Sequence, residues 1–174
     1  VSHFGSTSAT AQVFVQDHGP KLYRRSLYTY WKRTVPPPSM VTFDAPSREL
    51  CTMKRVTTNT PLQALVLLND PQFVEAARAF AQRIMLEGPD DVDGRIHFAF
   101  EAATSRLPNA KETAILKRTY DRELASWRTR REVAGRLLAV GESPRDRWLE
   151  PAEHAAWTTV VSIILNMDET VTKN

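Results

Sequence analysis

Hydrophobic residues recur every three to four positions through the last two thirds of the chain, which is the spacing of one face of an α-helix. Two of the predicted helices have a clear start. Thr60-Pro61 and Asp70-Pro71 each place a capping side chain before a proline, and proline suits the first helical position because that N–H needs no partner. The pattern therefore predicts one helix over residues 61–68 and a second from residue 71 to the Gly88-Pro89 break.

The second of these helices is predicted to be amphipathic. Its apolar stripe, at spacings of three and four, consists of Phe73, Ala76, Ala77, Phe80, Ala81 and Ile84. The charged and amide side chains that fall outside this stripe are Glu75, Arg78, Gln82 and Arg83. We expect the first set to face the core and the second set to face water.

Three further helices follow the same logic. One is predicted over residues 92–105, and another starts at Pro108-Asn109 and meets a candidate break in the charged stretch 128–132. The last opens at Glu150-Pro151 and fades into residues 166–169. Trp127 and Trp157 lie in the apolar stripes, so both are predicted to be core residues. About five amphipathic helices with short connections predict a mainly α fold, a helical bundle over residues 59–174.

Residues 1–58 do not share this pattern and are predicted to form an irregular arm of loops. The aromatic and β-branched residues of the segment 22–35 favour a short strand, although its length also suits a helix. The triple proline at 36–38 then predicts a polyproline-like connection.

Composition narrows the function classes. The 174 residues are 42% hydrophobic and 25% charged, as in an ordinary globular protein, and no apolar run is long enough for a membrane span. The chain does not begin with Met, so we expect residue 1 not to be the natural start. Residues 1–58 carry eight Lys/Arg and three Asp/Glu, a balance of +5, and residues 59–174 carry fifteen and seventeen, a balance of −2. This excess is too weak to predict nucleic-acid binding.

Few residues indicate metal, haem or nucleophile chemistry. His3, His18, His97 and His154 are far apart, and Cys51 is the single cysteine, so neither a metal site nor haem attachment is predicted within the chain. Ser47 lies outside any Gly-x-Ser-x-Gly turn and is not predicted to be a nucleophile.

The densest polar cluster lies before and at the start of the first predicted helix. Its members are Asp44, Ser47, Arg48, Glu49, Arg55, Asn59, Thr60 and Gln63, with Arg24, Arg25 and Arg33 upstream. Guanidinium groups in non-helical segments can bind an anionic or sugar ligand through paired hydrogen bonds. The alternative is that these side chains tie loops together and cap helices. Tyr28, Tyr30 and Trp31 likewise suit either stacking on a sugar ring or haem edge, or ordinary packing.

Several stretches together resemble the C-terminal part of the domain of unknown function 1553 family, typical of planctomycetes and related bacteria. They are residues 15–19, 23–38, 43–49, 57–71 and 164–169. The resemblance implies a piece of a large, exported protein that joins this domain to a domain of unknown function 1549 and often to a c-type cytochrome module. It supplies no catalytic residues, and any haem would lie on sequence upstream of this chain.

Three functional hypotheses are compatible with these features. The first is a non-catalytic helical interaction module that packs against the remainder of its own full-length chain, in a periplasmic or secreted protein. The second is that the polar cluster is part of an enzyme active site acting on polysaccharide or in electron transfer. The third is a carbohydrate-binding surface around Tyr28 and Trp31.

Overall fold

The computed structural model describes residues 16–29, 31, 36–47, 50–54 and 57–172. Those residues form α-helices and short 3₁₀-helices and contain no strand, so the prediction of a mainly α fold is confirmed. The chain divides into two compact units, residues 1–58 and 59–174.

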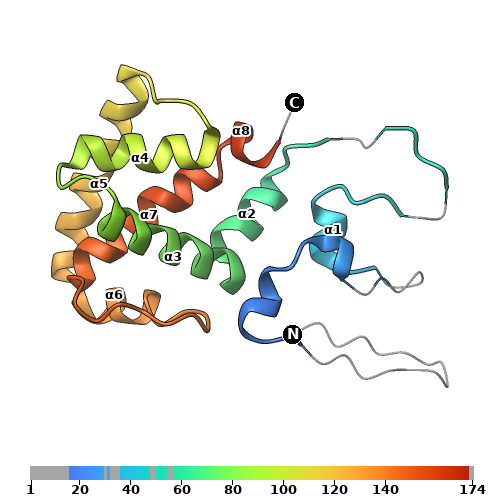
Figure 1. Cartoon of the computed structure of the whole chain (residues 1–174), viewed down its shortest axis with the longest axis horizontal. Coiled ribbons are helices and arrows are strands. Elements are labelled where there is room, and N and C mark those ends of the chain that lie inside the picture. Colours follow the sequence, from blue (N-terminus) through green and yellow to red (C-terminus); the bar gives the residue numbers. More distant parts are fainter. Residues whose placement is uncertain (1–15, 30, 32–35, 48–49, 55–56, 173–174) are drawn as a thin grey trace. The chain divides into compact units, whose positions relative to one another are not determined.

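The second unit is the helical one (Figure 1). Its helices are α2 (Pro61–Asn69), α3 (Pro71–Glu87), α4 (Val92–Thr104), α5 (Ala110–Thr129), α6 (Arg131–Leu137), α7 (Pro151–Leu165) and α8 (Asp168–Val171).

The helix starts predicted from proline and a preceding polar residue are confirmed. The Thr60 hydroxyl accepts the Gln63 N–H at 3.3 Å, and the Gln63 side chain accepts the Thr60 N–H at 2.9 Å. Asp70 caps α3 by accepting the Gln72 N–H at 2.9 Å. These bonds satisfy amide groups that have no partner inside the helix, which fixes where each helix begins.

Helix α7 forms the centre of the bundle. Nine of its fifteen residues are buried, including Trp157, Val160, Val161 and Ile164. It packs against α3, α5, α6 and α4, and Figure 1 draws it in the middle of those helices. A helix that is apolar on every side needs neighbours all round it, and four helices supply them.

The expectation of about five helices is wrong, because the described residues form eight α-helices. The predicted fourth helix is divided at Arg130, whose backbone (φ −118°, ψ 46°) leaves the helical region, so α6 is separate from α5. The short helix α8 follows α7, and a further short helix, α1 (Pro38–Thr42), lies in the first unit.

The first unit has little regular structure. Two 3₁₀-helices span Gly19–Tyr23 and Ser26–Tyr28, so the predicted strand is wrong over residues 22–29; residues 30 and 32–35 lie outside the described part. Pro20 lies in the first turn of the first 3₁₀-helix, and Arg24, between the two 3₁₀-helices, has an extended backbone. The proline run ends in a helix because Pro38, its last member, occupies the first helical position, where proline is tolerated.

Trp157 provides a test of the core. Trp157→Ala should lower the free energy of unfolding by about 3–5 kcal/mol, because it removes a fully buried indole and leaves a cavity. Trp148, which is 95% exposed, is the matched control, and Trp148→Ala should change stability by less than about 0.5 kcal/mol. Urea unfolding followed by circular dichroism measures both, and equal losses would contradict the assignment of the core.

Candidate functional site

Several residues of the predicted polar cluster form hydrogen bonds that stabilise the local fold. Asp44, at a positive φ of 58°, accepts the Thr58 N–H at 2.8 Å and the Thr58 hydroxyl at 2.8 and 2.9 Å. These bonds close the segment between the two residues. The Asp44 carboxylate therefore holds the backbone of the first unit.

The three cluster members in the second unit also have structural partners. The Asn59 amide donates to Asp168 at 2.7 Å, which ties the start of α2 to α8. Gln63 is buried and completes the Thr60 cap. Both arrangements match the structural alternative considered for the cluster.

The other predicted site residues lie in the first unit. Arg24, Arg25, Tyr28 and Ser47 are exposed, and Trp31 is half-buried. The Arg25 guanidinium lies 5.8 Å from the centre of the Tyr28 ring. Arg33, Arg48, Glu49 and Arg55 lie outside the described residues.

An unpredicted group of ionisable residues lies inside the second unit. Glu75, Arg78 and His154 are 2%, 1% and 0% exposed, so the prediction that Glu75 and Arg78 face water is wrong. Arg78 donates to the Ser143 carbonyl at 2.7 Å and to its hydroxyl at 2.6 Å, while Glu75 accepts the Ser143 N–H. The Nη2 atom of Arg78 lies 3.9 Å from Oε1 of Glu75. We call Glu75, Arg78, Ser143 and His154 the buried polar centre.

The loop between α6 and α7 buries this centre. It is fixed along α3 at Ser143 and again where the Asp146 N–H donates to Gln82 at 2.9 Å. Gly141, at a φ of 90°, allows the close approach, because a Cβ at this position would collide with the Glu75 carboxylate. The loop comes from about 65 residues farther along the chain than α3, so nothing in the local pattern of α3 indicates that it covers this face.

The surroundings of His154 favour its neutral form. Its Nε2 lies 3.0 Å from the Arg78 carbonyl oxygen, which can only accept, so Nε2 carries the proton. Burial lowers the pKa of His154, and the charges of Arg145 and Arg78 lower it further, whereas the Arg78 carbonyl and Asp146 oppose the shift. The His154 bond therefore ties α7 to α3, while Glu75 and Arg78 hold the loop at Ser143.

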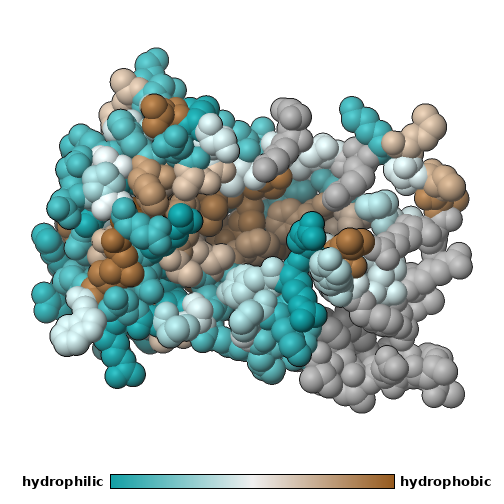
Figure 2. Space-filling view, viewed as in Figure 1, coloured by the Kyte–Doolittle hydropathy of each residue, from teal (hydrophilic) through white to brown (hydrophobic). Residues whose placement is uncertain are grey.

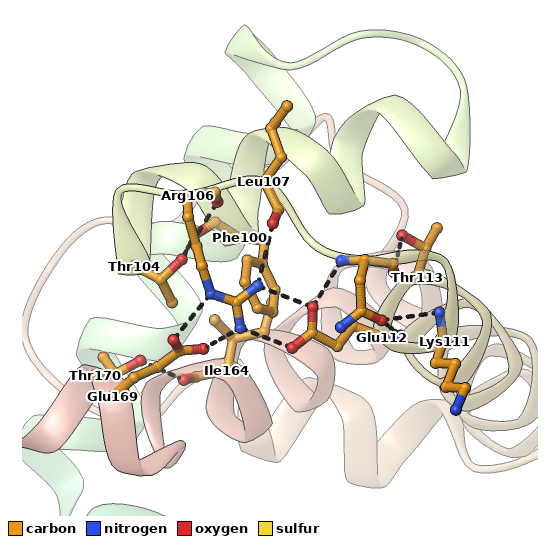
Figure 3. Close-up of polar contacts among 11 residues, drawn as sticks. Phe100, Thr104, Arg106, Leu107, Lys111, Glu112, Thr113, Ile164, Glu169 and Thr170 are labelled. Atoms are coloured by element: carbon orange, nitrogen blue, oxygen red, sulfur yellow. Dashed lines mark hydrogen bonds and ion pairs between the residues drawn. The ribbon is translucent and has the colours of Figure 1, made fainter.

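A second polar cluster lies on the surface and joins three segments (Figure 3). Arg106 donates to both oxygens of Glu112 and both oxygens of Glu169, at 2.7–3.0 Å, and its guanidinium lies 4.6 Å from the Phe100 ring centre. Glu112 also caps α5 through the Asn109 N–H. The hydrogen bonds from Arg106, followed in size by the bond from the Asn109 N–H, lower the pKa of Glu112 to about 2. The carboxylates of Glu112 and Glu169 raise the pKa of Arg106. The cluster holds α8 against the turn before α5.

Within the described residues, no three histidine, cysteine or carboxylate side chains converge as metal ligands, and no helix there has the length and hydrophobicity to cross a membrane.

The chain matches the model of a known protein family over more than half of its length. A family model described as "PSD1: Protein of unknown function (DUF1553)" matches residues 3–120. The match ends within α5, so the central helix α7 lies beyond it. Neither the curated proteins nor the solved structures contain a match.

The depressed pKa of His154 predicts a pH dependence. Below the unfolded-state value of about 6.5, the unfolded chain binds a proton that the folded chain resists, so the free energy of unfolding should fall as the pH is lowered from 7.5 to 5.5. His154→Gln should reduce this fall, whereas His97→Gln, at an exposed position, should leave it unchanged. Urea unfolding at both pH values measures the effect. Identical pH dependence in the wild type and His154→Gln would show that His154 is not the group responsible.

The Glu75–Arg78 couple predicts a strong non-additivity. Glu75→Gln leaves the Arg78 charge buried without a counter-ion and should cost about 3–5 kcal/mol. In Glu75→Gln/Arg78→Met both charges are gone, so the double variant should be more stable than the sum of the single changes predicts. A double-mutant cycle from urea unfolding gives the coupling energy, and a value near zero would mean that the two charges act independently.

Proposed function

Because the chain belongs to the family of proteins of unknown function DUF1553, we propose that it is a non-catalytic helical module packing against other segments of a longer, exported protein. The observation that carries this proposal is the exposed apolar face of α2, whose leucines the bundle leaves open to solvent.

Helix α2 is apolar on more sides than the bundle covers. Leu62, Leu65 and Leu68 are 56%, 58% and 46% exposed, while Gln63 is buried. No charged residue occurs from position 56 to 69. Figure 2 shows hydrophobic residues gathered in the middle of the view, where Figure 1 draws α2 and α7. We call Leu62, Leu65 and Leu68 the α2 face. An uncharged leucine face of this kind is typical of a helix that has a partner.

The first unit has a similar excess of uncovered apolar surface. None of its described residues, from 16 to 58, is buried, and Leu27, Leu50 and Met53 are 74%, 81% and 103% exposed. A segment that buries so little apolar surface gains little free energy to offset the entropy of ordering it. This supports a partner surface for the first unit too.

The size of the α2 face favours a partner within the same polypeptide. Three half-exposed leucines present on the order of 300 Å², whereas a stable complex between separate proteins buries about 800 Å² on each side. A tethered partner has an effective concentration in the millimolar range, so a small interface is sufficient. In the same proposal the partner domains are those of the family resemblance, a domain of unknown function 1549 and a cytochrome-type module, which carries any haem, and the protein is periplasmic or secreted.

A second candidate function rests on the first unit. Arg25 lies beside the Tyr28 ring, which is 63% exposed, and both groups are suited to an anionic or sugar ligand. In that case the predicted cluster, with Arg24, Trp31, Arg33, Ser47, Arg48 and Arg55, would belong to a carbohydrate-binding surface or to an active site. Glycan binding lost in Tyr28→Ala and kept in the matched variant Tyr23→Ala would support it.

Spin labelling tests the first proposal. In a Cys51→Ser background, a nitroxide is attached at Leu65→Cys or at Arg122→Cys, a control position whose side chain is 71% exposed. In the full-length protein the label at position 65 should be immobilised and the label at 122 mobile. In the 174-residue chain alone both should be mobile, because the proposal places the covering segment outside these residues. Electron paramagnetic resonance line shapes report the mobility.

Two results would contradict the proposal. A mobile label at position 65 in the full-length protein would mean that nothing covers α2. A label already immobilised in the 174-residue chain would mean that the chain covers the α2 face itself and needs no further segment.

A further inference from the structure

The junction between α5 and α6 gathers arginine side chains. Helix α5 ends at Thr129, Arg130 breaks the helical geometry, and α6 begins at Arg131. Arg128, Arg130, Arg131 and Arg136 are all exposed. We call these four arginines the junction patch. The segment 128–136 contains one acidic residue, Glu132. It therefore carries four positive charges and one negative charge, a balance of +3.

The patch arginines have no internal counter-ion among the described residues. The same is true of Lys111, Arg118, Arg145 and Arg147, so what sets the patch apart is that four such cations fall within nine residues. Elsewhere, Arg83 pairs with Glu87 at 2.7 Å, Lys117 with Asp93 at 2.8 Å, and Arg106 with two glutamates. No patch arginine forms an ion pair with any carboxylate in the part of the chain that the structure describes. Glu132 is four positions from Arg128 and four from Arg136. Side chains at this spacing can pair within one helix, but Glu132 pairs with neither arginine.

Arg128 and Arg136 lie in the last turns of α5 and α6, where a positive charge is favourable, but this position needs no clustering of the four arginines. Arg128, Arg130 and Arg131 lie within four residues across the break between α5 and α6, and like charges so close in the chain repel each other. The helical unit as a whole has a balance of −2, so the positive charge is local and not a property of the surface in general. Arg130 donates to the Ser126 hydroxyl at 2.5 Å, whereas the exposed guanidiniums of Arg128, Arg131 and Arg136 are suited to paired hydrogen bonds with oxyanions.

We propose that the junction patch binds an acidic polypeptide segment of a partner protein. Helix α6 has seven residues, which is about 10 Å of helix. In an extended peptide, side chains on one face repeat every ~6.7 Å, so two or three alternate carboxylates match this length. Val133, between the arginines and 37% exposed, adds a small apolar contact.

The surroundings of the patch favour a polypeptide over the other polyanions. Trp127, the aromatic residue at the junction, has the Arg130 guanidinium 4.8 Å from its ring centre, so that face is not open for stacking a nucleic-acid base. Besides Val133, no large hydrophobic residue of the segment 128–136 is exposed, so the patch has no apolar group that would insert into a lipid surface.

Fluorescence anisotropy with a fluorescein-labelled peptide of ten glutamates tests this inference. The 174-residue chain should bind the peptide at 50 mM NaCl and bind it more weakly at 200 mM. Arg128→Gln/Arg131→Gln should weaken binding at least tenfold. The matched control, Lys111→Gln/Arg118→Gln, removes two other exposed charges from α5 and should weaken binding less than twofold. Because all four positions are exposed, circular dichroism should show both variants folded.

Three results would overturn the inference: absence of binding at 50 mM NaCl, equal weakening in the two double variants, or tighter binding of a sulfated polysaccharide or an oligonucleotide through the same arginines. The last result would show that the surface recognises another polyanion. The junction patch and the α2 face use different residues, so either proposal can fail without the other.

Discussion

The structure depends on the need to cover α7 on every side. Its residues are apolar round the whole helix, and nine of them are buried. Helices α3, α4, α5 and α6 each turn a face towards it, so the bundle is organised around one helix. Helix α2 has only a minor share in this packing, which explains why its leucines stay exposed although it is as apolar as α7.

The packing around α7 also buries two charged side chains, Glu75 and Arg78. Glu75 and Arg78 on α3 face the α6–α7 loop and His154, and their desolvation is offset by each other and by the backbone of Ser143. Buried ion pairs of this kind often contribute little net stability, but removing one partner is costly. The couple therefore acts mainly to hold the loop in one position, and the same loop carries the exposed Trp148.

Local features of the fold are predictable from the sequence, and long-range ones are not. Thr60-Pro61 and Asp70-Pro71 fix helix starts through bonds to residues two or three positions away, so the sequence alone locates them. The periodic pattern places Glu75 and Arg78 on the polar face of α3. It cannot predict that they are buried, because their burial depends on Ser143, far along the chain. The aromatic content of residues 22–28 favours a strand, whereas Gly19-Pro20 sets the local geometry as a turn. Of the candidate site, the sequence reveals the density of polar residues, but not that Asp44, Asn59 and Gln63 bind Thr58, Asp168 and Thr60.

Native-state hydrogen exchange tests the central position of α7 most directly. Amides of α7 should exchange only through global unfolding, with the same opening free energy as urea unfolding gives, while α2 should open at a lower free energy. If α7 amides opened at a lower free energy than those of α3 and α5, α7 would not be the helix around which the bundle is organised.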